Sequence, residues 1–121
     1  MNRDVFFQSV SKVSVNEASL TAIFQNFTSK LPIAVKKILS IAPNGDFLDG
    51  GSFCRIMATD EIANASQELH VDFAKRSYLP IFDTGDNDFI VFDYKNNQWA
   101  KFNIVDEINF NNTDDLSALL K

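Results

Sequence analysis

Nucleophilic catalysis needs a reactive side chain beside a base, and the sequence offers few such pairs. The chain has one cysteine, Cys54, and one histidine, His70, so only one Cys–His dyad is conceivable. Cys54 lies in an apolar stretch that predicts a strand, which favours a small buried residue over a nucleophile. A zinc site usually needs several Cys or His ligands, and the chain has one of each. We therefore predict no catalytic residues, no metal and no other cofactor.

The densest group of carboxylates is Asp83, Asp86 and Asp88, in the segment DTGDND. Oxygen-rich loops can bind calcium, but this spacing differs from the D-x-D-x-D-G pattern and no bidentate glutamate follows it. A polar turn between two strands is the simplest interpretation. The remaining interpretation is a partner-binding loop, in which these carboxylates meet Lys or Arg side chains of a basic protein.

A second candidate binding surface follows the acidic loop. It consists of the aromatic residues Tyr94 and Trp99, whereas Asp93 would add a fourth carboxylate to the acidic complementarity of Asp83, Asp86 and Asp88. Exposed aromatic side chains are favoured as anchors of protein interfaces. The alternative is that Trp99 is buried under the N-terminal segment, against Phe6 or Phe7.

These residues would be positioned by strands within residues 78–104. Segments 89–94 and 99–104 are rich in β-branched and aromatic residues and predict a hairpin, with Asn96 and Asn97 as a two-residue turn. That turn would place Tyr94 opposite Trp99.

The two faces of this hairpin differ in polarity. We expect one face to point into the core and the other, which mixes aromatic and polar residues, to be partly exposed. The core face carries Phe89, Val91, Phe102 and Ile104. Residues 78–82 predict a third strand, in which Pro80 indicates an edge position or an irregularity.

Helices are predicted before and after this sheet segment in the sequence. Ser14 and Glu17 fit a capping box, followed by an apolar stripe of Leu20, Ile23, Phe24 and Phe27. Leu31-Pro32 would begin a second helix, whose stripe is Ala34, Val35, Ile38, Leu39 and Ala42. Thr59 would cap a third helix that ends near Arg76, and residues 113–120 predict a short C-terminal helix. Residues 53–57 predict a further strand, and residues 1–13 fit either an extended arm or a short helix.

Length and composition place the chain in a broad class. We interpret its 121 residues, 45% hydrophobic and 22% charged, as one globular domain spanning 1–121. No apolar run is long enough for a membrane span, and the N-terminus lacks the apolar core of a signal peptide. A single cysteine cannot form an internal disulfide. We therefore expect a cytoplasmic protein.

The net charge of −5 is unevenly distributed. Residues 1–81 contain eight acidic and eight basic residues, whereas residues 82–121 contain eight acidic and three basic ones. An acidic surface argues against nucleic-acid binding, which favours basic patches. It is compatible with a basic protein partner, and also with a role in solubility alone.

The order of these elements resembles the SUKH superfamily, also called Smi/Knr-like proteins. The resemblance covers residues 15–120 and rests on Leu31-Pro32, Ile38-Leu39, Asn44-Gly45, and Gly85-Asp86 before a strand. Two departures stand out. The family often has an acidic residue shortly before the Leu-Pro step, where this chain has Gln25 and Asn26, and its Asn-Gly-Gly turn is replaced by Asn-Gly-Asp.

The resemblance implies an α+β fold, with an antiparallel β-sheet packed against N-terminal helices and a short C-terminal helix. Many bacterial members are immunity proteins that bind and neutralise a toxin domain, often a nuclease, and fungal relatives are regulatory interaction proteins. The expected function is thus that of a non-enzymatic protein-binding domain whose partner is a basic toxin. A regulatory or scaffold module and a small hydrolase or isomerase are the alternatives.

Overall fold

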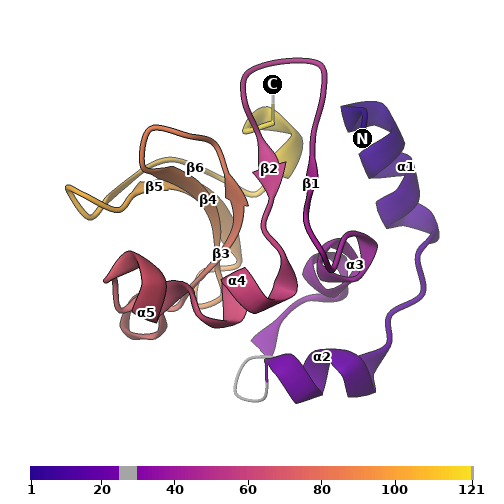
Figure 1. The fold of residues 1–121 in the computed structure, drawn as a ribbon, viewed down its shortest axis with the longest axis horizontal. Helices are drawn as coiled ribbons and strands as arrows, with labels where there is room; N and C mark the ends of the chain where they lie inside the picture. The colour runs from indigo at the N-terminus through magenta and orange to yellow at the C-terminus, as the bar shows by residue number, and fades with distance from the viewer. Residues whose placement is uncertain (25–29, 121) are drawn as a thin grey trace.

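The computed structural model describes residues 1–24 and 30–120, and it combines a six-stranded antiparallel sheet with short helices (Figure 1). The helices are α1 (Arg3–Lys12), α2 (Glu17–Ile23), α3 (Ile33–Ile41), α4 (Thr59–Ala63), α5 (Ala65–Leu69), α6 (Phe73–Arg76) and the 3₁₀ helix η2 (Leu116–Ala118). The strands, in their order across the sheet, are β1 (Asp46–Phe47), β2 (Arg55–Ile56), β3 (Tyr78–Asp83), β4 (Asp88–Asp93), β5 (Gln98–Asn103) and β6 (Ile108–Thr113). The predicted α+β class is confirmed, with N-terminal helices and a short C-terminal 3₁₀ turn.

Residues 1–13, for which the sequence left two possibilities, form helix α1 against the sheet. The Asn2 side chain caps the helix by accepting a hydrogen bond from the Asp4 amide at 2.7 Å. Phe6 is fully buried and lies between Phe7 and Phe82, with ring centroids 5.3 and 5.8 Å away. The first helix is therefore part of the core.

Arg3 ties α1 to two distant parts of the chain. Its guanidinium donates hydrogen bonds to the carbonyls of Leu48 at 3.0 Å, Ser52 at 2.8 Å and Leu120. Gly51 lies against this group, since a Cβ at Gly51 would be 3.1 Å from the guanidinium carbon. One side chain thus links α1, the β1–β2 loop and the C-terminal segment.

The second helix begins two residues later than predicted. Asn16, rather than Ser14, is its cap, accepting a hydrogen bond from the Ser19 amide at 3.1 Å. Of the apolar stripes predicted for α2 and α3, Ile23 and Ala34 are exposed, and the buried members are Leu20, Phe24, Val35, Ile38 and Leu39. Phe27, predicted in the first stripe, and the Gln25 and Asn26 positions lie outside the described residues.

The predicted third helix is broken into α4, α5 and α6. Helix α4 ends at Asn64, whose backbone leaves the helical region with a φ of −104° and a ψ of 9°. Left-handed backbone ends α5 at His70, with a φ of 57°, and ends α6 at Ser77, with a φ of 61°. Thr59 is the first residue of α4, and the cap position is Ala58, whose amide donates to the Glu61 carboxylate at 3.0 Å.

The β4–β5 hairpin is offset by two residues from the predicted register. Phe92 pairs with Trp99, where Tyr94 was expected, and residues 94–97 form a four-residue turn. The turn is closed by the Asp93 carboxylate, which accepts hydrogen bonds from the Lys95 and Asn96 amides at 3.0 and 3.1 Å. An offset of two keeps every side chain on its predicted face.

The face predicted to be partly exposed is so only through its polar residues and Tyr94, since Tyr94, Lys101 and Asn103 are half-buried while its other members are buried. On the face predicted to be exposed, Ile90, Phe92 and Trp99 are each at most 6% exposed. Pro80 lies in β3, inside the sheet and not at its edge, and the ladder is irregular between Pro80 and Phe82 as predicted. None of the helices in the described ranges has the length and apolar character needed to cross a membrane.

Candidate protein-binding surface

The turn between β3 and β4 carries three of the predicted site residues in three different environments. Asp83 accepts a hydrogen bond from the Gly85 amide at 2.9 Å, and Asp88 accepts one from the Asn103 side chain at 2.8 Å. Asp86 is exposed, with a φ of 51°, and forms no ion pair among the described residues. Asp86 is therefore the carboxylate of this turn that is open to a partner.

The other three predicted residues lie at the opposite end of β4, roughly 17 Å along the strand. Asp93 is 4% exposed and Trp99 is 6% exposed, so neither offers a surface to a partner in this structure. Trp99 is buried, as its alternative interpretation held, but it packs directly on Phe82 and Phe92, with ring centroids 6.3 and 5.0 Å away. Phe82 in turn contacts Phe6.

Tyr94 is half-buried beside the α6–β3 junction. The Lys30 ammonium lies 5.9 Å from its ring centroid, in cation–π geometry. Burial raises the pKa of the Tyr94 hydroxyl, while a hydrogen bond with Ser77 opposes that shift. The six predicted residues therefore do not form one surface but fall into two groups at opposite ends of β4.

Two residues that sequence reasoning missed, Phe47 and Phe53, form an exposed aromatic pair. Each is 52% exposed, and their rings meet edge to face with centroids 5.6 Å apart. Phe53 also lies beside the acidic turn, because a Cβ at Gly85 would be 3.5 Å from its ring. The available signal was the segment DFLDGGSF, in which a glycine-rich loop separates two phenylalanines and can fold them together.

Arg55 pairs with Phe47 across β1 and β2 and forms an ion pair with Asp83 of the acidic turn. Its guanidinium donates to both oxygens of Glu61, at 2.6 and 3.0 Å, and to Asp83 at 3.4 Å. The register of β2 on β3 sets the second contact, since Arg55 pairs with Asp83. The hydrogen bond from Arg55 lowers the pKa of Glu61, against the opposing effect of burial.

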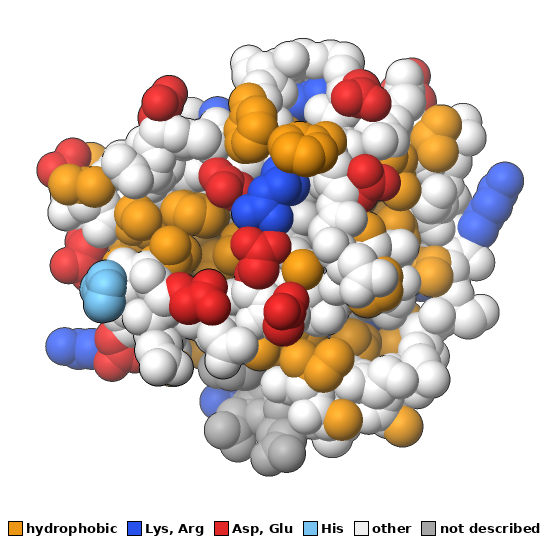
Figure 2. All heavy atoms as spheres, in the orientation of Figure 1, with side chains coloured by type: hydrophobic (Ala, Val, Ile, Leu, Met, Phe, Trp, Pro, Cys, Tyr) orange, Lys and Arg blue, Asp and Glu red, His pale blue; other side chains and the backbone are white. Residues whose placement is uncertain are grey.

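These contacts define one continuous surface, which we name the aromatic–acidic surface. It consists of Phe47, Phe53, Arg55, Glu61, Asp83 and Asp86. In Figure 2, basic side chains near the centre of one face are flanked by acidic ones, and hydrophobic side chains lie next to them. Its three carboxylates and one guanidinium leave a net negative charge beside exposed aromatic rings.

The residues considered for nucleophilic chemistry are not arranged for it in the described structure. Cys54 is buried, and burial raises the pKa of its thiol to about 11, so the thiol is protonated at neutral pH. His70 is exposed at the end of α5. No group of three or more His, Cys, Asp or Glu side chains within residues 1–24 and 30–120 is placed to hold a metal ion.

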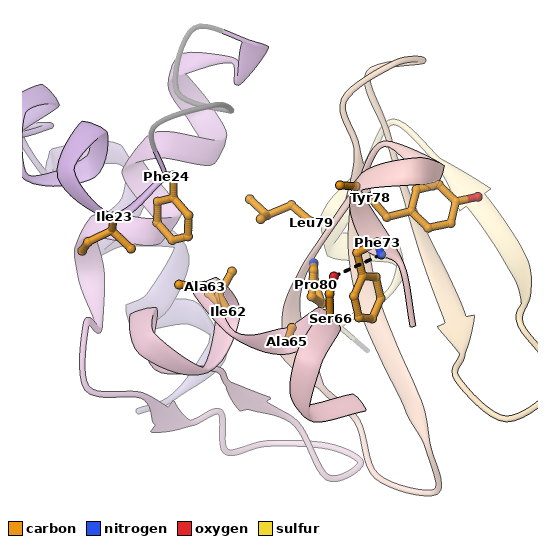
Figure 3. Close-up of a pocket in the computed structure, with 11 residues that line it drawn as sticks. Ile23, Phe24, Ile62, Ala63, Ala65, Ser66, Phe73, Tyr78, Leu79 and Pro80 are labelled. Carbon is orange, nitrogen blue, oxygen red and sulfur yellow. Dashed lines mark hydrogen bonds between the residues drawn. The ribbon is translucent and has the colours of Figure 1, made fainter. Parts of the chain in front are cut away.

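A small cavity lies between the end of α2, the helices α4–α6 and strand β3 (Figure 3). Its volume is about 80 Å³, and its lining is mostly apolar, including Phe24, Ile62 and Leu79. The Ser66 hydroxyl beside it already accepts a hydrogen bond from the Phe73 amide at 3.2 Å. The described lining contains no carboxylate, histidine or cation, so it offers an apolar space without acid–base groups.

Comparison with known proteins gives this chain no family assignment. No protein-family model matches it, and no curated protein or solved structure matches it either. The described fold and surface therefore define it only as an α+β domain with an exposed aromatic–acidic face.

Proposed function

We propose that this chain is a non-enzymatic protein-binding domain of the SUKH type. It acts in the cytoplasm as an immunity protein that neutralises a basic toxin domain by binding it and occluding its active surface. The observation that carries this proposal is the aromatic–acidic surface. Exposed aromatic side chains supply binding energy at interfaces, and surrounding carboxylates attract a basic partner.

The geometry supports binding at this surface in two ways. Phe47 and Phe53 hold each other in an edge-to-face contact, so less side-chain freedom is lost when a partner covers them. Arg55 is held by Glu61 and Asp83, which leaves Asp86 as the carboxylate able to pair with a partner's Lys or Arg. The resemblance to SUKH proteins supplies the toxin as the partner class.

The test is binding to the product of the neighbouring gene, purified and assayed for toxicity with and without this chain. We expect the chain to bind and inhibit it, and binding to weaken as salt rises. The Phe47→Ser/Phe53→Ser double variant should weaken binding by at least about tenfold. Ile33→Ser is the matched control, because Ile33 is 59% exposed on α3 and is not one of the residues that form this surface.

The outcomes separate the alternatives. A neighbouring product that is neither bound nor inhibited rules out immunity against it. Capture of a host regulatory protein, with the same dependence on Phe47 and Phe53, would instead support a regulatory module. Binding that is equal for the double variant and for Ile33→Ser would contradict the assignment of this surface.

A further inference from the structure

The strands at the two edges of the sheet differ in length and in how they are covered. At one edge, β1 is only two residues long, and the adjoining Asp49 amide donates to the Met1 carbonyl at 2.7 Å in a bridge between Asn2 and Asp49. At the other edge, β6 has six residues and pairs only with β5 among the described strands. One edge is thus short and covered, and the other is long and open.

The open edge has little of the protection that sheet edges usually carry. Strand edges are normally blunted by charges, prolines or bulges, because unpaired backbone groups invite another strand. The six residues of β6, INFNNT, include no charge and no proline. Ile108 and Phe110 are 56% and 36% exposed on the same face of the strand.

A bulge protects only the second half of this edge. The pairing changes register between Phe110 and Thr113, and Asn111 has a φ of 55°. The first half, residues 108–110, is therefore the regular part of the edge and the part able to accept another strand.

The charge near β6 favours a segment of a different protein over a second copy of this chain as the strand that pairs with this edge. Asp106 and Asp114 lie on either side of β6, are exposed and form no ion pair among the described residues. A second copy is disfavoured, because antiparallel pairing of two β6 strands places Asp106 of one copy close to Asp114 of the other. A basic segment from a different protein meets no such repulsion.

We propose that β6 is a second docking site, which binds an extended segment of a protein partner as an added antiparallel or parallel strand. The segment carries apolar side chains that contact Ile108 and Phe110, and Lys or Arg residues that face Asp106 and Asp114. Main-chain hydrogen bonds to the open edge provide affinity in this mode of recognition, and the side chains provide specificity.

A random library of peptides about 12 residues long, selected on the full chain, tests this directly. We expect selected peptides to alternate apolar β-branched or aromatic residues and to carry basic residues near their ends. Binding should weaken at least about tenfold in Ile108→Lys/Phe110→Lys, and should be unchanged in the matched charge control Ile33→Lys. Asp106→Asn/Asp114→Asn should flatten the salt dependence, and β6 amides should exchange more slowly when peptide is bound.

Two results would overturn the docking site. One is a selection whose peptides bind Ile108→Lys/Phe110→Lys as well as they bind the original chain. The other is a concentration-dependent dimer that the same double variant abolishes, which would make the occupant a second copy. Phe53→Ser should not affect these peptides, so failure here leaves the aromatic–acidic surface to be judged by its own test.

Discussion

Replacing Phe6 with alanine should destabilise the chain strongly, although this residue lies in a segment whose structure the sequence left undecided. Phe6 is fully buried between the rings of Phe7 and Phe82, and Phe82 also contacts Trp99. Removing its ring both loses buried apolar area and leaves a cavity in the centre of the aromatic cluster. Phenylalanine-to-alanine changes in such sites cost about 3–5 kcal/mol.

Urea denaturation followed by fluorescence measures this effect, because Trp99 is the only tryptophan and lies in the same cluster. With a typical urea dependence for a small domain, the loss corresponds to a midpoint lower by on the order of 2 M. Small domains are stable by about 5–15 kcal/mol, so the loss is a large fraction of the free energy of unfolding.

The neighbouring residue provides the matched control. Phe7 makes the same type of ring contact but is 36% exposed, so Phe7→Ala should cost only about 1 kcal/mol. Equal destabilisation by the two substitutions would show that α1 does not pack on the sheet through Phe6. Small effects from both would mean that the helix is not part of the cooperative core.

Three further predictions concern single side chains. Arg3→Met should lower the free energy of unfolding by about 2 kcal/mol, because it removes hydrogen bonds to main-chain carbonyls in two distant segments. Lys12→Met on the same helix is the control in the same denaturation assay and should have a smaller effect. Cys54 should react with a thiol reagent at pH 8 only as fast as the chain opens, because its buried thiol has a pKa of about 11; rapid reaction without urea would contradict its burial. His70→Gly should raise the free energy of unfolding by about 0.5–1 kcal/mol, since glycine adopts the left-handed backbone at this helix end without strain. Gln67→Gly inside α5 is the control and should lower it by a similar amount. Calorimetry of the two variants measures both effects.

Periodicity in the sequence predicted the elements whose faces are clearly apolar. Most residues of the α2 and α3 stripes and the core face of the β4–β5 hairpin were placed correctly, because the spacing of apolar residues fixes them. The hairpin register was not, since a two-residue turn at Asn96 and Asn97 ignored the carboxylate of Asp93. That carboxylate closes a longer turn, and no apolar pattern records such a hydrogen bond.

Strand β6 was missed for a related reason. Its asparagine-rich sequence lacks the alternation that predicts a half-buried strand, and five of its six residues are exposed. β6 forms because β5 offers it an edge to pair with. This is a tertiary interaction, which the local sequence does not reveal. The same feature makes β6 unusual as an edge, because nothing in its composition deters a further strand.

The candidate site was also only partly predictable. The acidic turn could be found from its sequence, but Phe53 looked like an ordinary strand residue and Phe47 was given no role. Their exposure depends on a short edge hairpin that leaves both rings outside the core. Trp99 was a reasonable candidate as an aromatic anchor, and it is buried because the sheet is covered on both faces.

A binding test that removes acidic charge from residues 82–121 must distinguish carboxylates with structural contacts from carboxylates without them. Asp93 is buried and closes a turn, Asp83 contacts Arg55 and Glu107 contacts Arg76. Neutralising any of these would change folding as well as charge, so lost binding could not be assigned to electrostatics. Asp86 and Asp106 lack such contacts among the described residues, and Asn at these positions changes charge alone. A fall in salt dependence with Asp86→Asn would therefore place a basic partner at the aromatic–acidic surface, and the same fall with Asp106→Asn would place it at β6.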